Sequence, residues 1–149
     1  DDQCDRELKQ FLQRLLKLRA ALPHLFNPVV PPREIRRKPL NPPKGLWRQW
    51  HGVKLGQPDW AAWSRTAAMS LHHNGEGALI WLGFNAYSDD LDFELPVPTS
   101  PWKRAIDTAQ LPGMELPEQM TTVEGSSLNL KSRSLVLLLA GQVAKDLKF

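Results

Sequence analysis

The segment LIWLGFNAYSDDLDFELP, residues 79–96, decides the fold because it holds two different strand patterns. Residues 79–84 are apolar on both faces. Residues 91–95 instead alternate apolar with acidic side chains, as expected of a strand with one solvated face. Asp89 and Asp90 between the two form a turn signal. The segment therefore predicts two antiparallel strands, of which the first is covered on both sides.

Five further segments fit short strands: 47–51, 66–72, 102–107, 126–130 and 134–140. Turn signals separate them, such as His73-Asn74-Gly75. Short strands at this spacing predict an antiparallel β-sandwich. The last strand is again apolar on both faces, so something covers the outer side of at least one sheet. Either the helix or the tryptophan-rich loop does this, or a partner domain is missing.

A helix and a linker precede the strands. Apolar side chains at positions 8, 11, 12, 15, 18 and 22 recur at three- and four-residue steps, which predicts a helix over about 5–22 that Pro23 ends. Six prolines within 27–45 predict an extended linker. The chain thus divides into a helical segment 1–26, a proline-rich linker 27–45 and a β-domain 46–149. Burying the six stripe residues represents on the order of 10 kcal/mol, so we expect the helix to dock on the sandwich, another copy or another domain.

Composition limits the classes of protein to consider. The length of 149 residues and 42% hydrophobic content fit one soluble domain. The net charge of +3, with bases clustered only at 33–38, argues against a nucleic-acid partner. The longest apolar run is too short for a membrane span, and no secretion leader is visible. The single cysteine, Cys4, excludes an internal disulfide and favours a reducing, cytoplasmic location. The absence of an initial Met suggests a fragment or a processed chain.

The sequence offers no convincing catalytic or metal site. Asp92 and Glu94 share a strand face, but the alternation around them predicts a solvated face rather than an acid pair. His72 and His73 are adjacent and would point to opposite faces of a strand, so they would not share a metal. Cys4 lies at the start of the helix and is expected to be an inert thiol. We therefore expect no catalytic residue, no metal and no cofactor.

The six tryptophans are the remaining candidates. Trp81 and Trp102 lie within strand patterns and are expected in the core. Trp60 and Trp63 lie in an irregular stretch, PDWAAWSR, and Trp50 lies just before it. These three are candidate contacts for an α-glucan, because a flat apolar ring suits the C–H face of a sugar. A neighbouring domain or local packing are the alternatives.

Four segments and the helix resemble a known family. WRQWHGVKLGQPDWAAWSR, residues 47–65, resembles the segment after the barrel in isoamylase-type debranching enzymes of glycoside hydrolase family 13. FNAYSDDLDFELP (84–96), WKRAIDTA (102–109) and KSRSLVLLLA (131–140) resemble later strands of that family, in the same order. FLQRLLKLRAALPHLF (11–26) is similar to the last barrel helix. The chain departs from the family at Ala61-Ala62-Trp63 and in its linker.

The resemblance implies a C-terminal, antiparallel Greek-key β-sandwich that packs against a catalytic (β/α)₈ barrel of the same polypeptide. The parent enzyme would hydrolyse α-1,6 branch points of glycogen or starch, in the cytoplasm or in the plastid stroma of a plant. Its catalytic acids lie on barrel strands that precede this chain. The leading expectation is a non-catalytic domain that stabilises the barrel. The alternative is an independent carbohydrate-binding module for α-glucans, and a complete small hydrolase lacks the residues. The bare helix stripe predicts that the chain alone self-associates or folds the helix back on the sheet.

Overall fold

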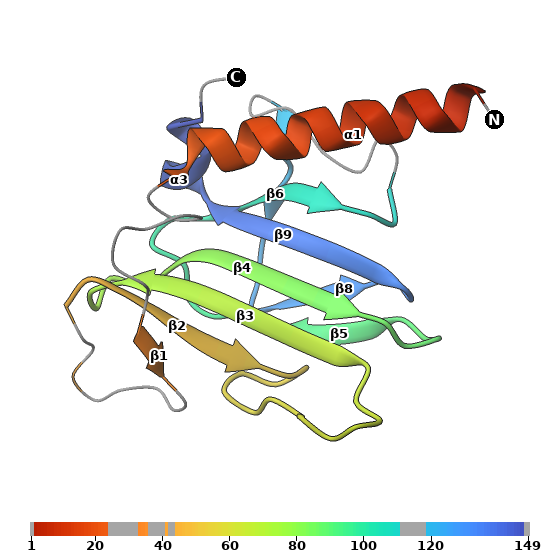
Figure 1. The fold of residues 1–149 in the computed structure, drawn as a ribbon. Helices are drawn as coiled ribbons and strands as arrows, with labels where there is room; N and C mark the ends of the chain where they lie inside the picture. Colours follow the sequence, from red (N-terminus) through yellow and green to blue (C-terminus); the bar gives the residue numbers. More distant parts are fainter. Residues whose placement is uncertain (1, 24–32, 36–40, 42–43, 111–118, 148–149) are drawn as a thin grey trace.

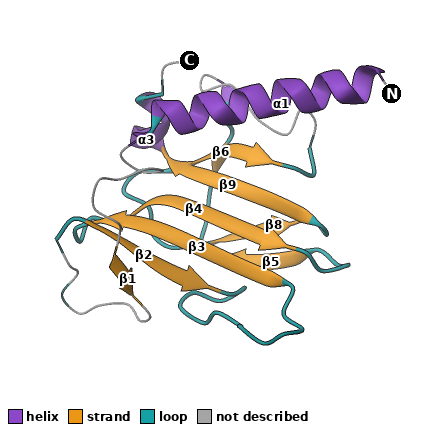
Figure 2. Ribbon diagram, in the orientation of Figure 1, coloured by secondary structure: helices purple, strands orange, loops and turns teal. Residues whose placement is uncertain are grey.

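The structure, a computed structural model, describes residues 2–23, 33–35, 41, 44–110 and 119–147, which form nine strands and two helices. Figure 1 shows their arrangement and Figure 2 their type. In chain order they are α1 (Asp2–Ala21), β1 (Arg33–Ile35), β2 (Leu46–His51), β3 (Thr66–His73), β4 (Ala78–Asn85), β5 (Leu91–Glu94), β6 (Trp102–Asp107), β7 (Thr122–Val123), β8 (Ser127–Leu130), β9 (Ser134–Ala140) and α3 (Gly141–Lys145).

Two sheets make up the β-domain. The large sheet has the order β1-β2-β3-β4-β9-β6-β7, and β5 pairs with β8 in a second sheet. All pairs are antiparallel except β1 with β2. The strands β4 and β9 are neighbours although they are far apart in sequence, as in a Greek key. The predicted fold class, an antiparallel β-sandwich after one N-terminal helix, is confirmed.

Large aromatic side chains fill the space between the sheets. Trp81 of β4 is fully buried and meets Phe93 of β5 edge to face, with ring centroids 5.9 Å apart. The ring of Trp81 lies over Gly83, where a Cβ would come within 2.2 Å of it. Trp102 of β6 is also buried, and its Nε1 donates to the Pro96 carbonyl at 3.2 Å. The prediction that Trp81 and Trp102 belong to the core is therefore confirmed.

The buried side chain of Asn85 ties two loops together at the end of β4. Its Nδ2 donates to the carbonyl oxygens of Asp89 at 2.9 Å, Leu130 at 3.2 Å and Lys131 at 3.1 Å. Its Oδ1 accepts from the Tyr87 backbone N–H at 3.0 Å. The amide thus satisfies both of its donors and an acceptor while only 1% exposed, as a buried polar group must.

The helix α1 docks on the sandwich through one part of its apolar stripe. Leu18 and Leu22 are buried in the same cluster as the strands, and Phe11 is half-buried against it. Leu8, Leu12, Leu15 and Leu16 are instead exposed, by between 37% and 65%. Figure 1 shows α1 beside the β6–β9 part of the large sheet, away from β2 and β3. The helix therefore folds back on the β-domain, yet a run of leucines stays in solvent.

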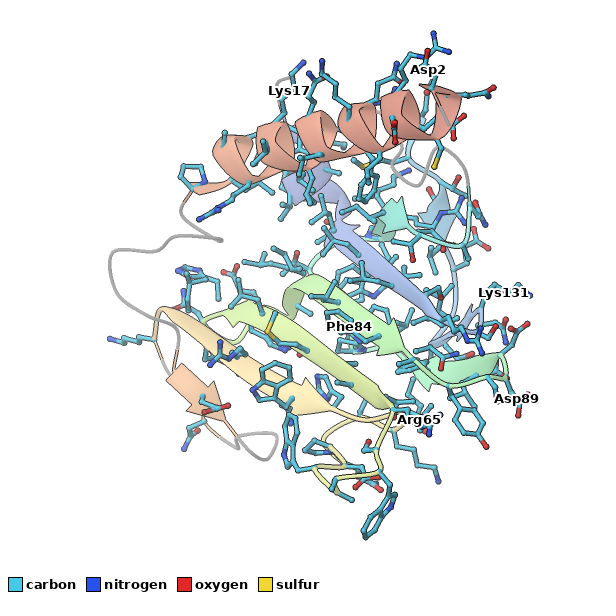
Figure 3. All side chains as sticks on the ribbon, turned by 45° about the vertical axis from the view of Figure 1, so that its right-hand side comes forward. Asp2, Lys17, Arg65, Phe84, Asp89 and Lys131 are labelled. Carbon is cyan, nitrogen blue, oxygen red and sulfur yellow. The ribbon has the colours of Figure 1, made fainter. Side chains whose placement is uncertain are left out.

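The outer face of β4 is covered at one end only. Ile80, Leu82 and Phe84 share that face because side chains alternate along a strand. Ile80 is 2% exposed, Leu82 is half-buried and Phe84 is 40% exposed. Figure 3 shows Phe84 on the part of the sheet away from α1. The outer face of β4 is thus covered at Ile80, which belongs to the core cluster, and exposed at Phe84.

The predicted strands lie within one residue of the observed ones, but three short elements were not predicted. They are β1, β7 and α3, of three, two and five residues. β1 lies within the predicted linker and pairs in parallel with β2. The rest of residues 27–45, apart from 41, 44 and 45, and residues 24–26 of the helical segment lie outside the described residues. The three domain boundaries remain a prediction. No helix within the described ranges is both long and apolar enough for a membrane span.

Candidate functional site

The acidic side chains singled out by the sequence have structural partners. Asp92 is exposed, and its Oδ1 accepts from Asn129 Nδ2 at 2.9 Å. Glu94 is exposed too, and its Oε2 accepts from the Leu55 backbone N–H at 3.0 Å. Within the described part of the chain, no group of three or more His, Cys, Asp or Glu residues could hold a metal ion. Both carboxylates thus connect neighbouring segments of the fold.

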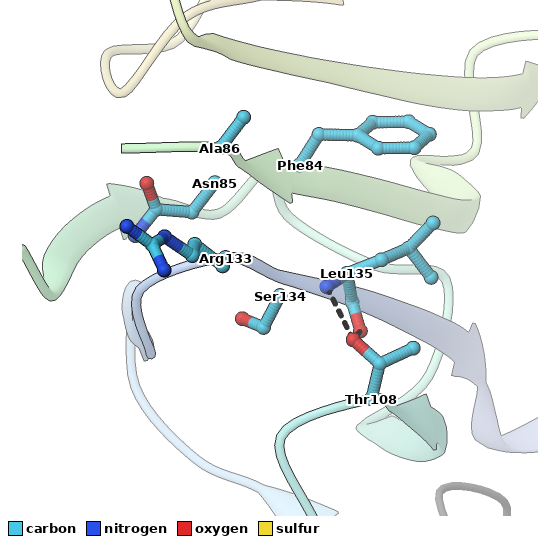
Figure 4. Close-up of a pocket in the computed structure, with 7 residues that line it drawn as sticks. All are labelled: Phe84, Asn85, Ala86, Thr108, Arg133, Ser134 and Leu135. Carbon is cyan, nitrogen blue, oxygen red and sulfur yellow. Dashed lines mark hydrogen bonds between the residues drawn. The ribbon is translucent and has the colours of Figure 1, made fainter. Parts of the chain in front are cut away.

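An open pocket of about 420 Å³ lies at the ends of β4 and β9. Figure 4 shows its lining, which consists of Phe84, Asn85, Ala86, Thr108, Arg133, Ser134 and Leu135. The Leu135 backbone N–H donates to Thr108 Oγ1 at 2.8 Å, which closes one wall. Hydrolysis of a glycosidic bond uses two facing carboxyl groups. None of the seven lining residues is acidic, so the lining does not supply that pair.

The three candidate tryptophans gather near the β2 side of the large sheet. Trp50 is half-buried, and its Nε1 donates to Glu34 Oε1 at 2.7 Å. Trp60 meets Trp50 edge to face, with centroids 5.4 Å apart and planes at 77°. Trp60 is 66% exposed and Trp63 is 81% exposed. The structure therefore brings Trp50 and Trp60 into contact and leaves Trp63 projecting from the same loop.

We call residues 52–65, which carry Trp60 and Trp63, the tryptophan loop. Its first half is held by the Gly56 N–H, which donates to His51 Nδ1 at 2.7 Å, and by the bond from Leu55 to Glu94. Its second half holds itself, because the Ala61 N–H donates to Asp59 Oδ1 at 3.0 Å and the Ser64 N–H to the Ala61 carbonyl at 2.9 Å. A loop fixed this way presents its aromatic rings with little entropy left to lose on binding.

Behind this loop lies a buried cluster that the sequence did not reveal. Ser70 Oγ of β3 lies 2.7 Å from His51 Nε2 and 2.7 Å from His72 Nε2. The ring of Trp47 stacks on His72, with centroids 3.9 Å apart and planes at 7°. The pKa of both histidines is lowered to about 4, chiefly by burial, and for His51 also by the nearby His72. The histidines are thus neutral at pH 7.

Sequence reasoning considered His72 only as a metal ligand. The signal that could have found the cluster is Ser70-Leu71-His72 on a predicted strand, since residues two apart share a face. His51 joins them through strand pairing, because it lies opposite Ala68 on the neighbouring strand. Register of this kind is set by the fold as a whole.

Fold and site together define the class: a small antiparallel β-sandwich domain whose described surface includes exposed leucine and tryptophan side chains. The family model described as "Isoamylase 1-3, C-terminal" matches residues 49–134, which is more than half of the chain. The chain therefore belongs to this family of C-terminal domains of isoamylase-type enzymes. A comparison with curated proteins found no match.

Proposed function

We propose that this chain is the non-catalytic C-terminal domain of a glycogen or starch debranching enzyme, and that it packs against the catalytic (β/α)₈ barrel and stabilises it. The barrel, of glycoside hydrolase family 13, hydrolyses α-1,6 branch points in the cytoplasm, or in the plastid stroma of a plant. The observation that carries the proposal is the row of exposed leucines on α1, at positions 8, 12, 15 and 16.

The leucine row lies beside the docked part of the same helix. Its members recur at three- and four-residue steps, so they share one side of α1. Full burial of a leucine contributes roughly 1.5–3 kcal/mol, and these side chains are about half exposed. A partner that covered all four would gain about 4 kcal/mol, before the open end of the sheet at Phe84 is counted.

The catalytic barrel is the occupant we favour for this surface. The family match describes a C-terminal domain, so the rest of the enzyme precedes it in the same polypeptide. The sequence of α1 is similar to the last barrel helix, which would pack in the outer ring of the barrel. The competing occupant is a second copy of this chain, which would use the same leucines.

The whole enzyme tests this proposal. Leu12→Glu puts a charge into the proposed interface, whereas Gln13→Glu puts the same residue beside it, at another exposed position of α1. Because an unpaired charge is costly to bury, we expect Leu12→Glu to make thermal inactivation of the debranching activity occur several degrees lower. Gln13→Glu should leave it unchanged. Equal behaviour of the two variants would contradict the proposal, and concentration-dependent dimerisation lost in Leu12→Glu would favour self-association.

A second candidate function is binding of α-glucans, which the high exposure of Trp60 and Trp63 favours. Titration of the chain with maltoheptaose, followed by tryptophan fluorescence, tests it. Binding that weakens roughly tenfold or more in Trp60→Ala or Trp63→Ala would support a carbohydrate-binding module. Val97→Ala is the matched control, since Val97 is 80% exposed outside the loop. No saturable binding by the unmodified chain would leave the tryptophans as contacts for the barrel.

A further inference from the structure

The hydrogen bonds around Ser70 form a series in which the donor and acceptor of each bond follow from the group at one end, the Gly56 N–H. The Gly56 N–H is a donor only, so His51 Nδ1 must be an acceptor. A neutral imidazole with an acceptor at Nδ1 carries its proton on Nε2. His51 Nε2–H therefore donates to Ser70 Oγ, at 2.7 Å. The hydroxyl proton of Ser70 is then left to donate to His72 Nε2, also at 2.7 Å.

The tautomer of His72 follows from the same order. Its Nε2 accepts from the Ser70 hydroxyl at 2.7 Å. Burial keeps the ring neutral at pH 7, because it lowers the pKa of His72 to about 4. A neutral imidazole with an acceptor at Nε2 carries its proton on Nδ1.

We propose that His51, Ser70 and His72 are positioning residues that form a proton-ordered chain of hydrogen bonds, with opposite tautomers at its two histidines, and that these bonds fix the tryptophan loop to β3. Each of the three bonds, Gly56 to His51, His51 to Ser70 and Ser70 to His72, has one donor and one acceptor. The stacked ring of Trp47 holds His72 in place. The consequence is a fixed presentation of Trp60 and Trp63 to whatever binds them.

An added proton breaks this order at either ring. On His51 it would sit on Nδ1 and face the Gly56 N–H, so two donors would meet. On His72 it would sit on Nε2 and face the proton of the Ser70 hydroxyl, so that hydroxyl would have to turn away. His72 would oppose protonation of His51 once it is itself protonated in acid. The two carboxylates at the loop, Glu94 and Asp59, already accept from the Leu55 and Ala61 backbone N–H groups. Acid should therefore release the loop at Gly56.

The role of the tryptophans in meeting a partner rests on the proposed function, whereas the proton order does not. Nuclear magnetic resonance of the ¹⁵N-labelled chain tests the order directly, because long-range couplings identify the protonated ring nitrogen. At pH 7 we expect the Nε2–H form for His51 and the Nδ1–H form for His72. The same tautomer at both rings, or titration of either near its ordinary pKa of about 6.5, would overturn the proposal.

Two substitutions of His51 separate its bond to the Gly56 N–H, which anchors the tryptophan loop, from its bond to Ser70. In His51→Asn the side-chain oxygen takes the place of Nδ1, so the Gly56 N–H keeps an acceptor. In His51→Gln the amide reaches Ser70 instead, and the Gly56 N–H loses its acceptor. Loss of a buried acceptor makes the Gly56 amide exchange with solvent roughly tenfold faster or more in His51→Gln. In His51→Asn the rate should stay near that of the unmodified chain. Equal exchange rates in the two variants would refute the anchor.

Substitutions of Ser70 test the middle of the chain. Ser70→Ala removes the shared oxygen, so we expect His72 to lose its tautomer preference and the tryptophan fluorescence to change, whereas His51 keeps the Nε2–H form because the Gly56 N–H still donates to its Nδ1. Ser70→Thr keeps the hydroxyl and should restore both signals. A Ser70→Ala protein in which His72 keeps the Nδ1–H form would contradict the proposal. If that variant does not fold, the tautomers of the unmodified chain still decide the question. If the enzyme without its C-terminal domain is as stable as the whole enzyme, the proposed function is refuted. The histidine tautomers and the Gly56 exchange rate would still test the proton order.

Discussion

Gly83 of β4 has no space for a methyl group, because the ring of Trp81 lies over it. A Cβ at this position would lie 2.2 Å from Trp81 Cη2 and 2.8 Å from Cζ3, whereas ordinary contacts begin near 3.4 Å. Gly83→Ala must therefore push the ring aside by about 1 Å or more. The ring is fully buried and meets Phe93 edge to face, so it has little room to move. Overpacking of a core costs roughly 1–3 kcal/mol, and we expect the upper end of this range.

A double-mutant cycle measures the cost and its cause. The expected loss of about 3 kcal/mol corresponds to a fall in Tm of about 6–12 °C for a domain of this size. Trp81→Phe removes the ring atoms that would collide, and also the buried Nε1, which has no hydrogen-bond partner. In that background Gly83→Ala should cost less than about 1 kcal/mol. Urea unfolding followed by circular dichroism gives all four free energies.

The outcome of the cycle discriminates between packing and backbone effects. A cost of Gly83→Ala that is the same with tryptophan and with phenylalanine at position 81 would refute the steric argument. So would a single variant as stable as the unmodified chain. A coupling energy of about 2 kcal/mol between positions 81 and 83 would show that the cost of Gly83→Ala comes from the overlap between its Cβ and the Trp81 ring.

Acid should destabilise the domain, because the pKa values of His51 and His72 are lowered to about 4 in the folded state. The unfolded chain binds more protons below pH 6.5, so stability is complete above that pH and is lost as the pH falls toward 4. Urea unfolding at pH 7 and pH 5 should differ by about 4 kcal/mol, half of it from each histidine, and equal stability at both would contradict this. Asn85→Ala leaves three carbonyl groups and one N–H without their partner and should cost about 2–4 kcal/mol in the same assay. Trp63→Ala should change stability by less than about 0.5 kcal/mol, since the side chain is 81% exposed; a larger loss would mean that it packs within the domain.

The longer strands could be predicted from the sequence because burial imposes a pattern on it. β5 has a buried Phe93 between two exposed acids, as its alternation predicted. β9 is apolar from Leu135 to Ala140, and its observed bounds are the predicted ones. β7 has only two residues and was missed, because no periodicity can develop over so short a length. α3 was missed for another reason: it begins after Ala140, which offers no side-chain cap.

The candidate site could be predicted only in its local part. The irregular sequence around Trp60 and Trp63 indicated rings free to contact a partner, and both are exposed. The cluster of His51, Ser70 and His72 depends on which residues lie opposite each other on β2 and β3. Such pairing joins residues about twenty positions apart and leaves no local pattern.

The two shortest strands have a consequence for behaviour at high concentration. A long, straight sheet margin with free amide groups invites further chains to add on, which leads to fibrils. Within the described part of the chain, one margin of the large sheet ends in the three residues of β1 and the other in the two residues of β7. Pro31 and Pro32 stand directly before β1, and proline has no N–H to offer an incoming strand. The large sheet thus offers little edge to which further chains could add, while the exposed apolar side chains remain available to a partner.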